Sequence, residues 1–200
     1  MYNFELASGY ALGIRWHTSS DQFTFSECDF KSPCTRRGIL STVASIFDPL
    51  GWIAPFTLLG KGILQDACKA AQDWDEPIDS DLKRRWLLWV KEAENIHSIR
   101  VDRCLKPKSV AVRTELHHFC DGAETGYGAC SYVRAILDTG EIKCDLILSK
   151  ARVAPIKVTT IPRLELQAAV LSSELHKFIT VEMKLTVDDI YFWTDTKIVL

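Results

Sequence analysis

The stretch His117-His118-Phe119-Cys120-Asp121-Gly122 is an apolar run that ends on a carboxylate followed by glycine. A second apolar run, Ile190-Tyr191-Phe192-Trp193-Thr194, ends in the same way on Asp195. Between the two runs, Glu165 lies about one turn into a helix-like segment. Carboxylates at strand ends and near a helix start can converge at one edge of a sheet. The pattern therefore predicts an α/β unit with an acidic edge.

The segments around these carboxylates alternate in type as the layers of an α/β unit do. The runs 110–113 and 115–120 are strand-like, 126–133 and 142–148 continue a meander, and 190–194 supplies a fourth strand. Thr159-Thr160 is a predicted N-cap, and the helix that follows has Pro162 in its first turn. Its predicted buried face consists of Leu164, Ala168, Leu171, Leu175 and Phe178.

The first half of the chain has a different pattern, and we expect two regions, 1–108 and 109–200. Region 1–108 opens with a hairpin signal, in which 11–16 and 22–25 flank a polar turn. Helices are predicted over 37–47, from about Pro55 toward Trp74, and after Asp79-Ser80. The last helix carries an amphipathic stripe that we expect to be core: Leu82, Trp86, Trp89 and Ala93. The fold class is α/β, or α+β overall.

Crowded carboxylates repel one another unless a hard cation lies between them, and magnesium prefers oxygen ligands. The three acidic residues therefore predict a metal site for phosphate chemistry, and one of them should have a raised pKa without metal. Each has a simpler alternative when it is taken alone. Asp121 could be a turn residue before Gly122, Glu165 a surface carboxylate, and Asp195 the cap of a helix that begins at Thr196.

The distribution of charge bears on nucleic-acid binding. The formal net charge is −2, so no global basic field attracts a polyanion. One segment is locally basic and contains no acidic residue: Lys150, Arg152, Lys157 and Arg163. Such a run is either a solvated surface or, beside a carboxylate site, a contact for a phosphate backbone.

The seven cysteines include no C-x-x-C pair, so neither a zinc ribbon nor a redox motif is supported. Their irregular spacing favours a reducing intracellular setting, cytoplasmic or nuclear. No signal peptide is visible at the N-terminus. The most apolar stretch, 52–64, is too short to span a membrane, so no membrane partner is expected.

The second region resembles the ribonuclease H fold. The matching motifs are Phe119-Cys120-Asp121-Gly122, the glycine-rich run that follows it, Leu164-Glu165-Leu166 and Trp193-Thr194-Asp195. The order Asp, Glu, Asp agrees with that family. The resemblance implies two Mg²⁺ ions, with Asp121 on both, Glu165 on one and Asp195 on the other, and hydrolysis of the RNA strand of an RNA–DNA hybrid.

A closer resemblance is to the pol polyproteins of BEL/Pao retrotransposons. Three strings carry it: Arg152-Val153-Ala154-Pro155, the segment 160–166, and Ile46-Phe47-Asp48-Pro49-Leu50-Gly51-Trp52-Ile53-Ala54-Pro55-Phe56. Leu12-Gly13-Ile14-Arg15-Trp16 resembles the end of a reverse-transcriptase palm. The resemblance implies that region 1–108 is a thumb and connection of reverse transcriptase, with the remainder of the polyprotein as partner.

The chain lacks some features of the family, and this lowers the activity that we expect of it. The family's fourth catalytic carboxylate lies well beyond the third, which is Asp195 in this sequence. No Tyr-x-Asp-Asp polymerase motif occurs in the chain either. Asp188-Asp189 is instead expected to begin a surface strand. We therefore expect a domain truncated at its C-terminus, with little or no nuclease activity alone. A non-catalytic relic that binds nucleic acid remains the alternative.

A remote alternative is an aspartic protease, because Asp138-Thr139-Gly140 resembles the active-site triplet of that class. The triplet lies at the expected turn between two strands, where Asp-x-Gly is favoured by turn chemistry alone. Glu141 also follows it, where a protease has a small residue.

Overall fold

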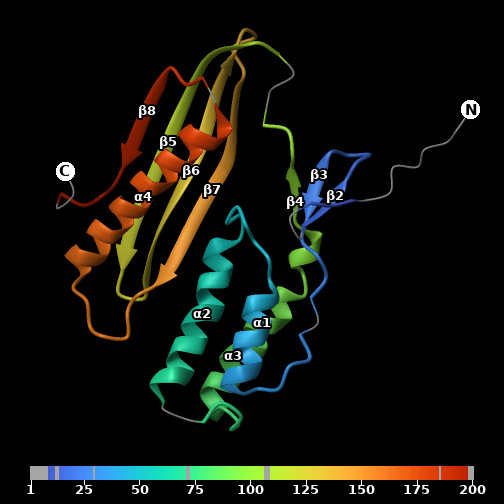
Figure 1. Ribbon diagram of the computed structural model, residues 1–200, viewed down its shortest axis with the longest axis vertical. Coiled ribbons are helices and arrows are strands. Elements are labelled where there is room, and N and C mark those ends of the chain that lie inside the picture. The colour runs from blue at the N-terminus through green and yellow to red at the C-terminus, as the bar shows by residue number, and fades with distance from the viewer. Residues whose placement is uncertain are drawn as a thin grey trace, which may run out of the picture. The chain divides into compact units, whose positions relative to one another are not determined.

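A computed structural model describes residues 9–11, 14–28, 30–70, 73–105, 109–184 and 186–197. The chain divides into two compact units, the first formed by Met1–Pro49 and Leu59–Leu105 and the second by Leu50–Leu58 and Lys106–Leu200. Figure 1 labels helices and strands of both units. Together they contain helices and mixed sheets, which confirms the predicted α/β class.

A small antiparallel sheet in the first unit has the order β1 (Gly9–Ala11), β2 (Ile14–His17), β3 (Gln22–Thr24), β4 (Arg100–Asp102). The predicted hairpin is confirmed, because β2 pairs with β3 in the register Trp16↔Phe23. Residues Leu12 and Gly13 of the palm-like string lie outside the described residues.

This unit also contains the helices α1 (Arg36–Ser45) and α3 (Ser80–Ala93), the short 3-10 helix η1 (Ile96–Ser98) and most of α2 (Ala54–Lys69), whose residues 54–58 belong to the second unit. The α3 N-cap is Asp79, whose carboxylate accepts hydrogen bonds from the first-turn amides of Asp81 and Leu82. The predicted core stripe of α3 is confirmed: Trp86 and Trp89 are buried, and their rings stack with centroids 4.9 Å apart.

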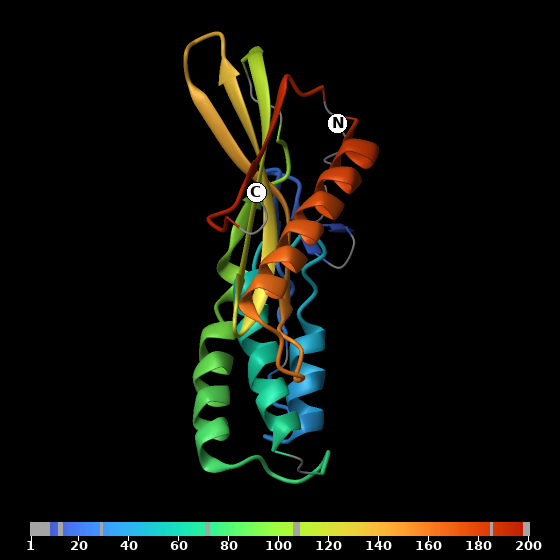
Figure 2. The same ribbon diagram turned by 90° about the vertical axis from the view of Figure 1, so that its left-hand side faces the viewer.

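The second unit is a four-stranded sheet covered on one face by a helix (Figures 1 and 2). Its strands are β5 (Ala111–Ala123), β6 (Gly126–Leu137), β7 (Ile142–Val153) and β8 (Asp189–Trp193), in the order β7-β6-β5-β8. β5, β6 and β7 are an antiparallel meander, and β8 lies parallel to β5. The predicted strands 110–113 and 115–120 form one continuous strand, and β7 continues past 148 to Val153.

The covering helix is α4 (Ile161–Met183). Leu164, Ala168, Leu171 and Leu175 are buried as predicted. Phe178 is not: its side chain is 54% exposed, and Ile179 takes the inner position instead. The spacing explains the error. Position 178 continues the alternation of four- and three-residue steps from 164, but a seven-residue repeat drifts by about 20° per repeat on a straight α-helix, so the inner position passes to 179.

A short segment from the first half of the sequence belongs to the second unit. The Leu50 carbonyl accepts a hydrogen bond from the Ser149 amide, and the Gly51 carbonyl accepts one from the Ser149 hydroxyl. Gly51 has φ +73, and a Cβ there would lie 1.9 Å from the Ser149 carbonyl oxygen. Glycine is therefore required by both its backbone conformation and its contact with β7.

Candidate metal centre

Three carboxylates come together at one edge of the second unit's sheet. Asp121 lies near the end of β5, Glu165 in the second turn of α4, and Asp195 two residues beyond β8. One oxygen of each lies within 4.8 Å of the other two. The part of the chain that the structure describes contains no other such group of three His, Cys, Asp or Glu side chains.

The parallel pairing of β5 with β8 brings the two aspartates to the same edge. Phe119 is the register partner of Trp193, the last residue of β8, and Asp121 and Asp195 each follow this pair by two residues. Gly122 allows α4 to approach this edge. A Cβ at position 122 would lie 2.6 Å from the Glu165 amide nitrogen, a contact that no larger residue can make without moving the helix.

The three carboxylates differ in their surroundings. Asp121 and Asp195 are exposed, and Asp121 Oδ1 accepts a hydrogen bond of 2.8 Å from the Gly122 amide. Glu165 is only 8% exposed, and within the described residues its Oε2 atom has no hydrogen-bond partner. Burial raises the pKa of Glu165, the charges of Asp121 and Asp195 raise it further, and the Gly122 amide opposes them.

This donor set fits a hard divalent cation. It supplies only carboxylate oxygens, and a buried oxygen without a partner is a vacant acceptor that a cation would satisfy. The nearby thiol of Cys120 is not a competing ligand, because burial raises its pKa and keeps it neutral near pH 7. Asp121, Glu165 and Asp195 are therefore the residues that would hold Mg²⁺.

The histidines beside the site make hydrogen bonds within the fold. His118 is fully buried, with Nδ1 2.7 Å from the Ser131 hydroxyl and Nε2 3.1 Å from Nδ1 of His176. Burial, followed by the neighbouring imidazoles, lowers the pKa of His118 to about 4. On the other face of β5, His117 Nδ1 accepts a hydrogen bond of 3.0 Å from the Trp193 indole.

The four basic residues lie outside the carboxylate cluster. Lys150 and Arg152 are on β7, Lys157 is in the loop that follows, and Arg163 is in the first turn of α4. All four are exposed. None forms a salt bridge with another described residue.

A groove of about 700 Å³ adjoins the acidic edge, and no pattern in the sequence indicated it. Asp121 and Asp195 lie at its border, Phe119 and Trp193 contribute aromatic walls, and residues 54, 55 and 58 line it from the start of α2. Phe119 and Trp193 are 42% and 48% exposed. An alternation pattern marks such side chains only as facing one side of a sheet, and does not reveal whether that side is covered.

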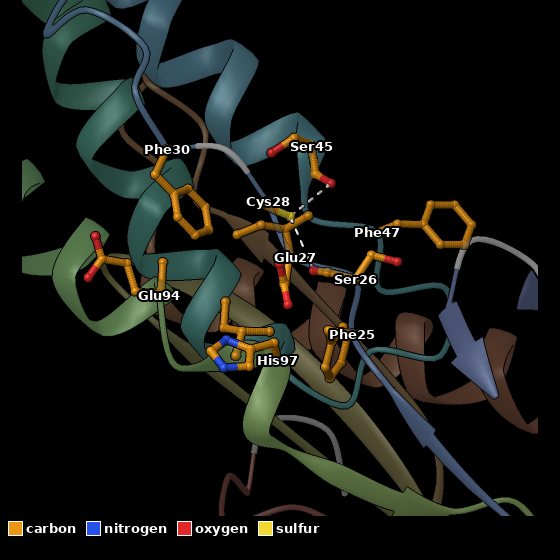
Figure 3. Close-up of a pocket in the computed structure, with 12 residues that line it drawn as sticks. Phe25, Ser26, Glu27, Cys28, Phe30, Ser45, Phe47, Glu94 and His97 are labelled. Carbon is orange, nitrogen blue, oxygen red and sulfur yellow. Dashed lines mark hydrogen bonds between the residues drawn. The ribbon is translucent and has the colours of Figure 1, made fainter. Parts of the chain in front are cut away.

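The first unit has a smaller cavity of about 250 Å³ (Figure 3). Phe25, Phe30 and His97 are among its lining residues, and the Phe47 ring points away from it. The Cys28 thiol donates to the carbonyl oxygens of Ser26 and Ser45 at 3.6 Å. This cavity has no cluster of metal-binding side chains within the described residues.

The protease-like triplet forms the turn between β6 and β7. The Gly140 amide donates to the Leu137 carbonyl, and Gly140 has φ +82. A glycine with positive φ in a hairpin turn accounts for Asp138-Thr139-Gly140 without catalysis.

Comparison with known proteins agrees with the fold. No helix in the described ranges is both long and apolar enough to cross a membrane. None of the curated proteins that were compared matches the chain. A family described as Pao retrotransposon-like RNaseH-like domain matches residues 35–196, a span that includes helices α1 to α3 as well as the sheet. The chain therefore belongs to this family of retrotransposon ribonuclease H-like domains.

Proposed function

We propose that the second unit is a magnesium-dependent nuclease that hydrolyses the RNA strand of an RNA–DNA hybrid. The single observation that carries this proposal is the convergence of Asp121, Glu165 and Asp195 within 4.8 Å around an unpartnered buried oxygen. A structural role, such as capping a helix or forming a salt bridge, would account for a single carboxylate at this edge. It does not explain three that lie together when no described Lys or Arg forms a salt bridge with any of them.

The three carboxylates would have different roles in ion binding, because they differ in position and exposure. Asp121 and Asp195 are exposed at the strand ends, where they can accept ions that arrive with substrate, while the buried Glu165 fixes the inner side of the site. Bound divalent ions would lower the pKa of a water molecule and stabilise charge on the phosphate oxygens. The Gly122 amide holds Asp121 in place by donating to Oδ1.

Exposed basic side chains support a polyanionic substrate. Lys150, Arg152, Lys157 and Arg163 are exposed and form no salt bridge with another described residue, so a phosphate backbone can pair with them at no loss of internal salt bridges. Because such contacts are made to backbone and sugar, we expect recognition of helix shape with little sequence preference.

For the first unit we propose descent from a reverse transcriptase, with residues 1–108 as a thumb and connection and the rest of a pol polyprotein as partner. The support is the resemblance of the strings around Ile14 and around Pro49 to that class. The setting that we propose is intracellular, cytoplasmic or nuclear. Coding sequence that continues from this chain into an integrase is the expected finding, and unrelated flanking sequence would contradict the proposal.

The test of the nuclease proposal uses the 200-residue chain and an RNA–DNA hybrid labelled on the RNA strand. We expect binding that requires Mg²⁺ and slow cleavage of the RNA strand alone, both lost in Asp121→Asn. Asp138→Asn is the matched control, because it removes an exposed carboxylate from a turn outside the site. Binding without Mg²⁺, unchanged in Asp121→Asn, would instead support the non-catalytic relic.

A further inference from the structure

We propose that the groove beside the acidic edge holds one unpaired base of the nucleic-acid substrate, stacked against Phe119 and Trp193. This inference rests on the proposed nuclease function and adds a preference to it. The preferred substrate has an unpaired nucleotide next to the phosphate at the carboxylates, as occurs where a hybrid meets a single strand.

A row of aromatic rings lies on the sheet face opposite α4. Alternate residues of β5 and β8 supply them: His117 and Phe119 from one strand, Tyr191 and Trp193 from the other. The His117 and Tyr191 rings are 4.9 Å apart with 18° between their planes. The Phe119 and Trp193 rings are 6.1 Å apart with 13° between theirs. The planes are nearly parallel, so the rings form one stack along the strands.

The stack ends at the metal centre. Asp121 comes two residues after Phe119 on β5, and Asp195 comes two residues after Trp193, just beyond β8, so a carboxylate follows each ring at the same spacing. Phe119 and Trp193 are therefore the last rings of the row and remain about half exposed. A planar aromatic group placed beside them would continue the stack and would lie directly next to the carboxylates.

The floor of the groove leaves room for such a group. Asp121 pairs in register with Gly128, which pairs with Ala151, so the strands next to the acidic edge carry only small side chains here. Pro55 and Leu58 line the groove from α2. Its volume of about 700 Å³ falls in the range of about 300–1,000 Å³ that is usual for small-molecule sites.

The chemistry of the groove favours a nucleobase over other planar ligands. A substrate held by its phosphate at the carboxylates places its own neighbouring nucleotide within reach of the rings. Aromatic side chains stack on every base, so this contact adds affinity without sequence selection. A base that is already unpaired enters at the least cost, whereas a paired base must first leave its duplex.

The test compares two RNA–DNA hybrids that differ only in one unpaired nucleotide at the end of the RNA strand. Binding is measured by fluorescence anisotropy in Ca²⁺, a hard cation with oxygen ligands like Mg²⁺. We expect the unpaired nucleotide to tighten binding by at least about fivefold. An abasic residue at the same position should remove that gain, and this arm needs no change to the protein.

Variants of the protein then locate the contact. Phe119→Leu and Trp193→Leu should each reduce the gain to less than about twofold, while binding of the blunt hybrid is kept. Phe178→Leu is the matched control, since Phe178 is also about half exposed but lies on α4 outside the groove. Phe119 is the cleaner variant, because Trp193 also donates a hydrogen bond to His117.

The outcomes separate this inference from the nuclease proposal. Equal binding of the two hybrids, or an abasic residue as good as a base, would overturn the inference and leave the nuclease proposal standing. Failure of the chain to bind any hybrid in the presence of a divalent ion would overturn both. A gain that survives in Phe119→Leu and Trp193→Leu would show that the base binds elsewhere and would also overturn the inference.

Discussion

Gly122→Ala tests whether the close approach of α4 to β5 builds the acidic edge. The added Cβ would lie 2.6 Å from the Glu165 amide nitrogen and 2.7 Å from the Leu164 carbonyl carbon. Both are backbone atoms, so no side chain can rotate away and the start of α4 must move by several tenths of an ångström or more. Overpacking of this kind costs about 1–3 kcal/mol, which corresponds to a fall in Tm of about 2–12 °C for a chain of this size.

The same shift should weaken the metal centre, because Glu165 moves with the helix. We expect the rise in Tm caused by Mg²⁺ to be lost or greatly reduced in Gly122→Ala. The assay is thermal unfolding followed by circular dichroism, with and without Mg²⁺. Gly62→Ala in α2 is the matched control: no atom lies within 4 Å of its Cβ position, so it should be neutral or stabilising. A Gly122→Ala chain as stable and as responsive to Mg²⁺ as the parent would refute the reasoning.

Three further predictions concern charge and packing. Glu165→Gln should raise the Tm of the metal-free chain by about 2–4 °C, because it removes a buried charge beside two carboxylates. The same substitution should abolish the rise in Tm caused by Mg²⁺. A lower Tm of the metal-free chain would contradict this prediction. The pKa of His118 is lowered to about 4, so the unfolded chain binds more protons between pH 6.5 and pH 4. The free energy of unfolding should have its full value above pH 6.5 and fall by about 3 kcal/mol toward pH 4. Urea unfolding at a series of pH values measures this fall. No loss of stability between pH 6.5 and pH 4 would argue against a neutral His118. Trp86→Ala should lower the free energy of unfolding by about 3–5 kcal/mol, against little change for the exposed Leu88→Ala, as urea unfolding would show.

Local pattern was sufficient to predict most of the second unit. The meander, the helix after Thr160 and the strand before Asp195 follow from periodicity and turn residues, which act over a few neighbours. The approach of Asp121, Glu165 and Asp195 to one another could be expected because parallel neighbours end at one edge of a sheet. The raised pKa of one carboxylate was also expected, although burial contributes more to it than charge crowding does.

Features that depend on contacts distant in sequence could not be predicted. The binding of Leu50 and Gly51 to Ser149 joins residues about 98 apart, and nothing local in either segment specifies the partner. The two strands predicted before and after Thr114 form one strand because Arg113, Thr114 and Glu115 all pair with residues of β6. Phe178 illustrates the reverse problem, since an apolar residue one position from the inner face looks like core in a sequence.

The open groove beside Phe119 and Trp193 was unpredictable for a related reason. Whether an aromatic residue on a sheet face is covered depends on which other segment reaches that face. The start of α2 reaches only part of it, and residues 54, 55 and 58 line the groove without filling it.

Calorimetric titration of the metal-free chain with Mg²⁺ tests the central claim most directly, since it asks whether the three carboxylates hold a cation. We expect saturable binding of Mg²⁺, with an affinity that Asp121→Asn and Asp195→Asn each reduce at least about tenfold and that Asp138→Asn leaves unchanged. The absence of saturable binding, or equal binding by the parent chain and by Asp121→Asn, would contradict it.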